Sequence, residues 1–319
     1  MKYPLQSRGL FGRKYLDLQE RVREIEAPDG EHALVKVRAC GVCGTDVNFV
    51  RDWQDDPQAL GHEIAGEVLE GGRHVRGFQA GDRVIVEDCS LCGTCPDCKS
   101  GHPELCRNLY NLEGQPGMGE YLSVRCNSLV RFEGLDFAHA SLTEPVAVSL
   151  TAVLNAQVPL GGSVLVLGCG PLGLMVARLA RLRGAGWVGI TGLAADNPRE
   201  KARLAAAGRL GCDLTIQVGK DDVEREVKNR FPAGVDRVIV SSPPESLYDA
   251  FKVIRFGGII TFFGLHFGGK SKVSVDVNDL VFRKVSLIPT FGFDRAADTL
   301  RGIVEGTLPV IKAVMLPHG

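Results

Sequence analysis

Beyond residue 161 the chain alternates short apolar runs with longer amphipathic stretches. The apolar runs have the length of buried strands, and the amphipathic stretches carry apolar residues at helical spacing. Strands are predicted at residues 163–167, 187–191, 237–240 and 258–263, and helices at residues 172–183, 198–210 and 243–256. This alternation predicts βαβ units and a doubly wound parallel sheet, so the fold class is α/β.

The first third of the chain has a different pattern, in which shorter apolar or alternating runs are separated by turns that contain glycine. Strands are predicted there at residues 32–38, 63–69 and 83–87. A chain of 319 residues exceeds the usual size of a single hydrophobic core. We therefore expect two domains, a β-rich one followed by the parallel sheet.

Composition narrows the class of partner. Hydrophobic residues make up 45% of the chain and charged residues 24%, and the formal net charge is −1. Scattered basic residues leave no electrostatic footprint for nucleic acid or an anionic membrane surface, so a small-molecule substrate is expected. Apolar runs such as residues 164–167 and 259–263 are too short to cross a bilayer, and residues 1–12 lack the apolar block of a secretory signal. A cytoplasmic location is expected.

Five of the ten cysteines lie between residues 89 and 106. Four of them have the spacing CxxCxxCx7C, namely Cys92, Cys95, Cys98 and Cys106. Four thiolates at this spacing, among turn-forming residues, predict a closed structural zinc site. The alternative is that they are buried or disulfide-paired cysteines. Cys89 is interpreted as a spectator, although its spacing also allows it to replace one of the four.

A second group of metal-ligating residues lies upstream. Cys43 stands in the glycine-flanked turn ACGVCGTD, and His62 lies beside Glu63 in LGHEIAG. Thiolate, imidazole and carboxylate are natural zinc ligands. Taken alone these residues also fit ordinary packing, because Cys40 is close to Cys43 and a histidine beside a glutamate is common.

The first predicted strand of the parallel sheet runs directly into the glycine motif GCGPLG. Gly168, Gly170 and Gly173 allow a tight turn and a close approach of pyrophosphate to the next helix, which begins near Pro171 and Leu172. A plain glycine turn is the alternative.

The second predicted strand ends without the acidic residue that binds the adenosine ribose, since Gly192 occupies that position. A ribose 2′-phosphate would then not be repelled, and Arg199, Lys201 or Arg203 are candidates to bind it. Asp196 lies four residues on and would restore NAD binding, and the basic residues also fit a solvated helix face. We therefore expect NAD or NADP as the cofactor, with NADP slightly favoured.

The motifs CGVCGTD, GHEIAGEV, GDRV, the four cysteines, TEPVAV and VLVLGCGPLG follow in one order. This series resembles the zinc-containing medium-chain dehydrogenase/reductase family, within the alcohol dehydrogenase superfamily. The resemblance implies a GroES-like catalytic domain over residues 1–145 and 290–319, with the zinc lobe at 89–106, and a Rossmann domain over residues 146–289. It also implies a homodimer or homotetramer.

The same resemblance assigns roles to single residues. Cys43 and His62 are implied as ligands of a catalytic zinc, with Glu63 as a ligand or a close neighbour. Glu144 in TEPVAV stands where ethanol-type enzymes have a cysteine, and glutamate there is similar to the polyol (sorbitol-like) and threonine dehydrogenase branches. The alternative role of Glu144 is a carboxylate at a helix start, stabilised by the helix dipole.

The resemblance also bears on three residues that follow Cys43, namely Thr45, Asp46 and Asn48. Thr45 resembles the hydroxyl that takes the alcohol proton, and Asp46 resembles the carboxylate that orients a ligand imidazole. Many relatives have a histidine where this chain has Asn48, which cannot ionise. We therefore expect proton release through the cofactor ribose and water, with no kinetic pKa typical of an imidazole.

The function expected is hydride transfer between a secondary alcohol, as in a polyol or sugar alcohol, and NAD(P), with two zinc ions per chain. L-threonine 3-dehydrogenase and aldose 1-dehydrogenase activities are alternatives, and a non-catalytic zinc- and nucleotide-binding scaffold is the alternative from another class. The linker from Cys43 to His62 is short, and the chain after Arg283 is compressed by about two elements between Pro289 and Phe293.

Overall fold

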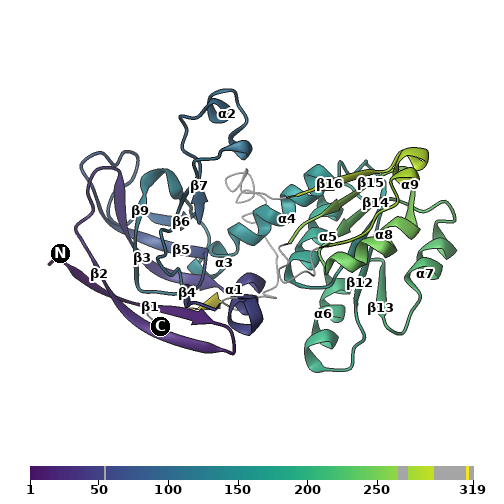
Figure 1. The fold of residues 1–319 in the computed structure, drawn as a ribbon, viewed down its shortest axis with the longest axis horizontal. Coiled ribbons are helices and arrows are strands. Elements are labelled where there is room, and N and C mark those ends of the chain that lie inside the picture. Colours follow the sequence, from purple (N-terminus) through teal and green to yellow (C-terminus); the bar gives the residue numbers. More distant parts are fainter. Residues whose placement is uncertain (54, 265–271, 291–313, 316–319) are drawn as a thin grey trace. The chain divides into compact units, whose positions relative to one another are not determined.

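A computed structural model describes residues 1–53, 55–264, 272–290 and 314–315 (Figure 1). The described residues form two compact units, residues 1–147 with 314–315, and the described part of residues 148–290. The compressed segment predicted between Pro289 and Phe293 lies largely outside the described residues.

The second unit is a six-stranded parallel sheet with the order β13-β12-β11-β14-β15-β16. Helices α5 and α6 contact each other, as do α7 and α8, so the helices pack in pairs on the sheet. The strands are β11 (Ser163–Leu167), β12 (Trp187–Leu193), β13 (Leu214–Val218), β14 (Val235–Val240), β15 (Ile254–Phe262) and β16 (Ser286–Pro289). The helices are α5 (Pro171–Leu182), α6 (Pro198–Arg209), α7 (Val223–Arg230), η4 (Pro244–Ser246), α8 (Leu247–Val253) and α9 (Val277–Arg283). The predicted parallel sheet is confirmed.

One predicted element in this unit is wrong in part. The helix expected over residues 243–256 ends at Val253, because Ile254 already pairs with Val235 as the first residue of β15. Ile254 is only 1% exposed, so pairing and burial under the sheet override the helical pattern at this position.

The first unit contains antiparallel sheets. One has the order β2-β1-β4, and a larger one has the order β10-β6-β5-β3-β17, with β9 also paired to β3. Its strands are β1 (Leu5–Arg13), β2 (Asp17–Ile25), β3 (His32–Gly41), β4 (Gln58–Ala59), β5 (Glu63–Gly71), β6 (Arg83–Val86), β7 (Cys89–Ser90), β8 (Tyr110–Asn111), β9 (Tyr121–Arg125), β10 (Leu129–Arg131) and β17 (Val314–Met315). Its helices are α1 (Gly44–Asn48), η1 (Phe49–Trp53), α2 (Pro96–Lys99), η2 (Pro103–Leu105), η3 (Cys126–Ser128) and α3 (Phe137–Ala140).

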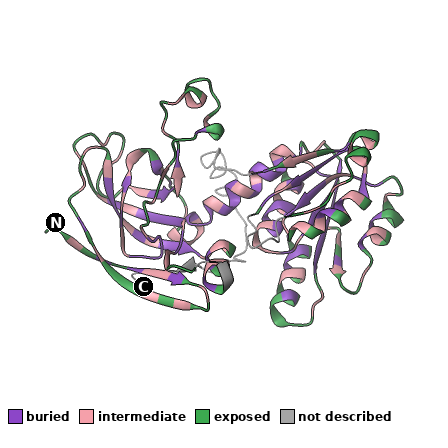
Figure 2. Cartoon of the chain, viewed as in Figure 1, coloured by how far each residue is buried: buried purple, intermediate pink, exposed green. Residues whose placement is uncertain are grey.

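The three strands predicted in this unit are confirmed, and the long hairpin of β1 and β2 adds two that were not predicted. Its pattern is hard to read in sequence because β2 is an edge strand whose Leu18 and Val22 are exposed beside charged residues. Figure 2 shows the buried residues concentrated along the central strands of each unit.

Helix α4 (Thr143–Asn155) runs from the first unit into the second. Among the described residues, the helical stretch Phe137–Asn155 is the one long and apolar enough to cross a membrane. Since 61% of this stretch is buried inside the protein, it equally fits the core helix of a globular domain.

Candidate metal and cofactor sites

The pairing of β3 with β5 brings the two upstream metal-ligand motifs together. Gly41 at the end of β3 lies opposite Glu63 at the start of β5, so the turn that follows β3 meets the residues that precede β5. Cys43 stands in that turn as the N-cap of α1, with an extended backbone. The ligand atoms of Cys43, His62 and Glu63 therefore lie within 4.8 Å of one another.

Asp46 ties the two backbone segments to each other. One carboxylate oxygen accepts a hydrogen bond from the N–H of Cys43 at 3.0 Å, and the other accepts from the N–H of Gly61 at 2.9 Å. The second oxygen also lies 3.8 Å from Nδ1 of His62. With 4% of its surface exposed, Asp46 is a buried carboxylate that holds both ligand-bearing segments in place.

The fully buried carboxylate of Glu63 packs directly against β3. A Cβ added to Gly41 would lie 2.0 Å from an Oε atom of Glu63, so any larger residue at position 41 would displace this carboxylate. The absence of a side chain at Gly41 is thus what allows a carboxylate to lie beside Cys43 and His62.

The surroundings of His62 favour a positive charge. Burial disfavours the imidazolium, but the hydrogen bond and charge of Cys43, followed by the charges of Asp46 and Glu144, outweigh it and raise the pKa of His62 to about 10. In chemistry and in spacing, a thiolate, an imidazole and a carboxylate fit a zinc ion.

Glu144 lies in the first turn of α4, as its alternative role at a helix start requires, and its charge acts on His62. It is not part of the group whose ligand atoms lie within 4.8 Å of one another. Thr45 and Asn48 lie on α1 with Asp46, and both are half-buried.

The four clustered cysteines converge as their spacing predicts, since their sulfur atoms lie within 4.8 Å of one another. Short backbone turns aim N–H groups at these sulfurs, for example from Cys95 to Cys92 at 3.3 Å and from Cys98 to Cys95 at 3.5 Å. N–H and hydroxyl donors, those of Thr94 foremost, lower the pKa of Cys92 to about 6. All four are free cysteines, and the donor set fits a structural zinc.

Cys89 stands outside this group. Burial, followed by the charge of Asp88, raises the pKa of Cys89 to about 11, which keeps it protonated at neutral pH. Its predicted role as a spectator is consistent with both observations.

In the second unit the glycine motif turns sharply between β11 and α5. Gly168 has a φ of +112°, and a Cβ at Gly173 would lie 1.8 Å from the carbonyl oxygen of Gly168, so both positions require glycine. Gly170 is the N-cap of α5, followed by Pro171 and Leu172, and a Cβ there would meet no described atom within 4 Å. The described residues therefore do not crowd the backbone at Gly170, and the N–H groups of a helix N-terminus can bind a phosphate.

Two residues of this region are missing from the prediction. Ser241 and Ser242 follow β14, which lies beside β11 where the strand order reverses. The hydroxyl of Ser241 lies 3.1 Å from the carbonyl oxygen of Leu167 and thus supports the turn. The hydroxyl of Ser242 is buried and has no hydrogen-bond partner among the described residues. The sequence contains a signal for both residues, because the two serines directly follow the apolar run of a buried parallel strand.

The end of β12 has no room for a side chain at Gly192, where a Cβ would lie 2.9 Å from Leu204 and 3.0 Å from Cys169. Arg203 donates to Glu200 at 3.1 Å, and Glu200 is 7% exposed. Arg199 is exposed, and its side chain forms no ion pair or hydrogen bond with a described residue.

Asp196, the candidate for restoring NAD binding, forms an ion pair with Lys220 at 3.2 Å. Its side chain is 74% exposed, so this pair is weak. Lys201, the third basic candidate, is exposed on α6.

Two family models match the chain. The alcohol dehydrogenase GroES-like domain matches residues 29–134, and the zinc-binding dehydrogenase domain matches residues 171–305. The chain is 30% identical to the sorbitol dehydrogenase of Bacillus subtilis strain 168 over 88% of this chain and 80% of the relative. It is 32% identical to the L-threonine 3-dehydrogenase of Bacillus velezensis over 83% of this chain and 78% of the relative.

Among solved structures, the fold is similar to that of a protein described as a zinc-binding dehydrogenase from Sinorhizobium meliloti 1021, bound to NADP. The TM-score is 0.84 with 27% identity, and the match covers 98% of this chain and all of the other. The antiparallel first unit and the parallel second unit thus correspond to a GroES-like domain and a Rossmann domain.

Proposed function

Because this chain belongs to the zinc-dependent medium-chain dehydrogenase family, we propose that it transfers a hydride between a secondary alcohol of a polyol or sugar alcohol and NADP. The observation that carries this proposal is the convergence of the ligand atoms of Cys43, His62 and Glu63. The negative charge of Glu144, which helps to raise the pKa of His62, supports it. The similarity to a sorbitol dehydrogenase supports a polyhydroxylated substrate.

In this proposal Cys43, His62 and Glu63 hold the catalytic zinc and Glu144 is a further ligand. Zinc supplies a Lewis acid that lowers the pKa of a bound hydroxyl toward about 7. Thr45 accepts and passes on the proton of the substrate hydroxyl. Asp46 fixes the two ligand-bearing segments through its hydrogen bonds to Cys43 and Gly61. Asn48 has no ionisable group, so the proton must leave by another route.

For the cofactor, we propose that the pyrophosphate binds at the N-terminus of α5 and that Arg199 binds the 2′-phosphate of NADP. Arg199 is exposed and has no carboxylate partner among the described residues, whereas Arg203 is paired with Glu200. The match to a structure bound to NADP supports this preference.

A second zinc is proposed at the four clustered cysteines, giving two per chain. We further propose a homodimer or homotetramer, to be tested by light scattering.

L-Threonine 3-dehydrogenase activity is the second candidate, favoured by the 32% identity to an enzyme of that name. Both candidates use the same proposed ligands, so the metal group does not discriminate between them. Discrimination depends on the residues that contact the carbons next to the reacting hydroxyl.

Initial rates of the zinc-loaded enzyme with sorbitol, an aldose and L-threonine, each with NAD and NADP, test these alternatives. We expect the highest kcat/KM with the polyol and NADP. Glu144→Gln should lower kcat/KM at least about tenfold, whereas Glu133→Gln, at an exposed glutamate in the same unit, should leave it unchanged. Preference for threonine or the aldose would overturn the substrate assignment. No turnover despite two bound zinc ions and bound cofactor would favour the scaffold.

A further inference from the structure

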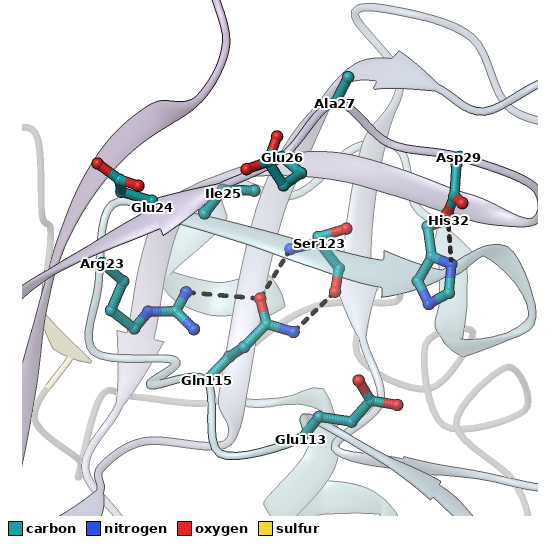
Figure 3. A pocket seen from close by; sticks show the side chains of 10 residues that line it. All are labelled: Arg23, Glu24, Ile25, Glu26, Ala27, Asp29, His32, Glu113, Gln115 and Ser123. Atoms are coloured by element: carbon teal, nitrogen blue, oxygen red, sulfur yellow. Dashed lines mark hydrogen bonds and ion pairs between the residues drawn. The ribbon is translucent and has the colours of Figure 1, made fainter.

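The first unit contains a cavity that is lined by none of the proposed metal ligands. It is a cavity of about 440 Å³ between the end of β2, the start of β3 and the turn after β8 (Figure 3). This volume lies within the range of about 300–1,000 Å³ that is typical of small-molecule pockets. His32, at the start of β3, lines the cavity, and Gly41, at the other end of the same strand, adjoins the metal group. At about 3.3 Å per residue the two sites are about 30 Å apart along the strand.

Arg23 lines this cavity and has no carboxylate partner among the described residues. Its guanidinium forms no ion pair with a described residue and donates a single hydrogen bond, to the side-chain oxygen of Gln115 at 3.5 Å. Its Nε–H is buried and has no partner among the described residues. Burial also lowers the pKa of Arg23, so its surroundings do not yet compensate the charge. A half-buried guanidinium with unused donors is costly unless a ligand or water accepts from it.

The polar wall beside Arg23 is held rigidly. The side-chain amide of Gln115 donates to the carbonyl oxygen of Ser123 at 2.7 Å and accepts from its N–H at 3.0 Å. Figure 3 shows these two bonds and the contact from Arg23 converging on the same amide. Because β9 fixes this amide, the direction in which Arg23 presents its remaining donors is restricted.

Carboxylates line the rest of the cavity. Glu26 and Glu113 form no ion pair with a described residue, whereas Asp29 lies 3.9 Å from His32 and Glu24 accepts a hydrogen bond from a glutamine of β1. Neither Glu26 nor Glu113 approaches Arg23 within ion-pair distance. The cavity thus holds unmatched charges of both signs that do not neutralise each other directly. An anion alone would be repelled by the carboxylates, and a cation alone would leave Arg23 unmatched.

We propose that this cavity binds a free α-amino acid, whose carboxylate contacts the guanidinium of Arg23 and whose ammonium group lies between Glu26 and Glu113. A zwitterion places both charges on adjacent carbons and so satisfies both parts of the cavity at once. The planar guanidinium suits a carboxylate in a two-point contact. This site does not depend on the function proposed above, since it includes none of the metal or dinucleotide residues.

Calorimetric titration of the zinc-loaded full chain with L-alanine tests the proposal. Propionate and ethylamine serve as matched probes, because each keeps one charged group of L-alanine and lacks the other. We expect L-alanine to bind at least about tenfold more tightly than either probe. Arg23→Gln, and separately Glu113→Gln combined with Glu26→Gln, should weaken binding of L-alanine at least about tenfold. Arg21→Gln removes an exposed arginine of the same strand outside the cavity and should change nothing.

Arg23→Lys keeps the charge but loses the planar donor pair, so it should also weaken binding of L-alanine. This variant tests the proposal in case Arg23→Gln fails to fold. Thermal unfolding of each variant shows whether it is folded. The proposal is overturned if L-alanine does not bind at millimolar concentration, if propionate binds equally well, or if the Arg23 variants bind like the wild type. Turnover is not measured, so failure here is distinct from failure of the dehydrogenase assignment.

Discussion

Substitution of Asp46 by asparagine should weaken both the proposed metal site and the fold around it. Asp46 accepts from the N–H groups of Cys43 and Gly61 at 3.0 and 2.9 Å, from a position that is 4% exposed. Asparagine has nearly the same shape but a single oxygen, so it can accept from only one of these groups. Its NH₂ then faces the other N–H, and two donors oppose each other in a buried place.

The size of this effect follows from the two bonds. A hydrogen bond to a charged group contributes about 1.5–3 kcal/mol, and here one is lost and the other becomes a weaker neutral bond. We therefore expect Asp46→Asn to lower the free energy of unfolding of the metal-free protein by about 2–4 kcal/mol. Because the two ligand-bearing segments are no longer held together, zinc affinity should fall about 10–100-fold.

Urea unfolding of chelator-treated protein measures the first quantity, and zinc competition with a chromophoric chelator measures the second. Asp56→Asn is the matched control, since it removes the same charge from an exposed side chain in the same unit. The reasoning is refuted if Asp46→Asn keeps its zinc affinity within twofold of the control and unfolds at the same urea concentration.

Three further predictions concern the other sites. In metal-free protein the raised pKa of His62 adds stability that is complete below pH 6.5 and is lost as pH rises toward about 10. The free energy of unfolding, measured in urea, should therefore fall by about 1.4 kcal/mol per pH unit in this window. An equal fall in the variant His62→Gln would contradict this cause. Cys98→Ser should reduce bound zinc by about one ion per chain, measured by elemental analysis, whereas Cys126→Ser should not; equal zinc contents would disprove a four-cysteine zinc site. Gly173→Ala places a Cβ 1.8 Å from a carbonyl oxygen of the turn and should weaken dinucleotide binding at least about tenfold, measured by fluorescence titration. The control Gly208→Ala, whose Cβ meets no described atom within 4 Å, should leave the affinity unchanged. Unchanged affinity in Gly173→Ala would show that the turn is not a binding element.

Several features follow from local sequence alone. Apolar runs bounded by glycine turns predict the parallel strands because the strands of such a sheet are buried on both faces. Every residue of β11 is buried, and every residue of β12 except the last. The four clustered cysteines lie within 14 residues of one another in sequence, so short turns suffice to bring them together. The family itself is predicted from the order of motifs and is confirmed by the family models.

Other features depend on residues far apart in sequence. The register of β3 against β5 decides that Cys43 meets His62 and Glu63, and the hydrogen bonds of Asp46 decide how firmly they are held. The wrong helix over residues 254–256 has the same origin, since strand pairing with Val235 outweighs local propensity.

The sequence by itself thus determined which candidate metal-ligating residue types are present, where the glycine turn lies and which family the chain belongs to, because each of these depends on short contiguous motifs. Only the tertiary structure decided which charges meet. In the structure Arg203 is paired with Glu200 and Arg199 is exposed. Arg23 lines a cavity and has no carboxylate partner in the part of the chain that the structure describes. The physical reason is that Coulomb and hydrogen-bond energies depend on distances between side chains, and those distances are set by strand register and packing.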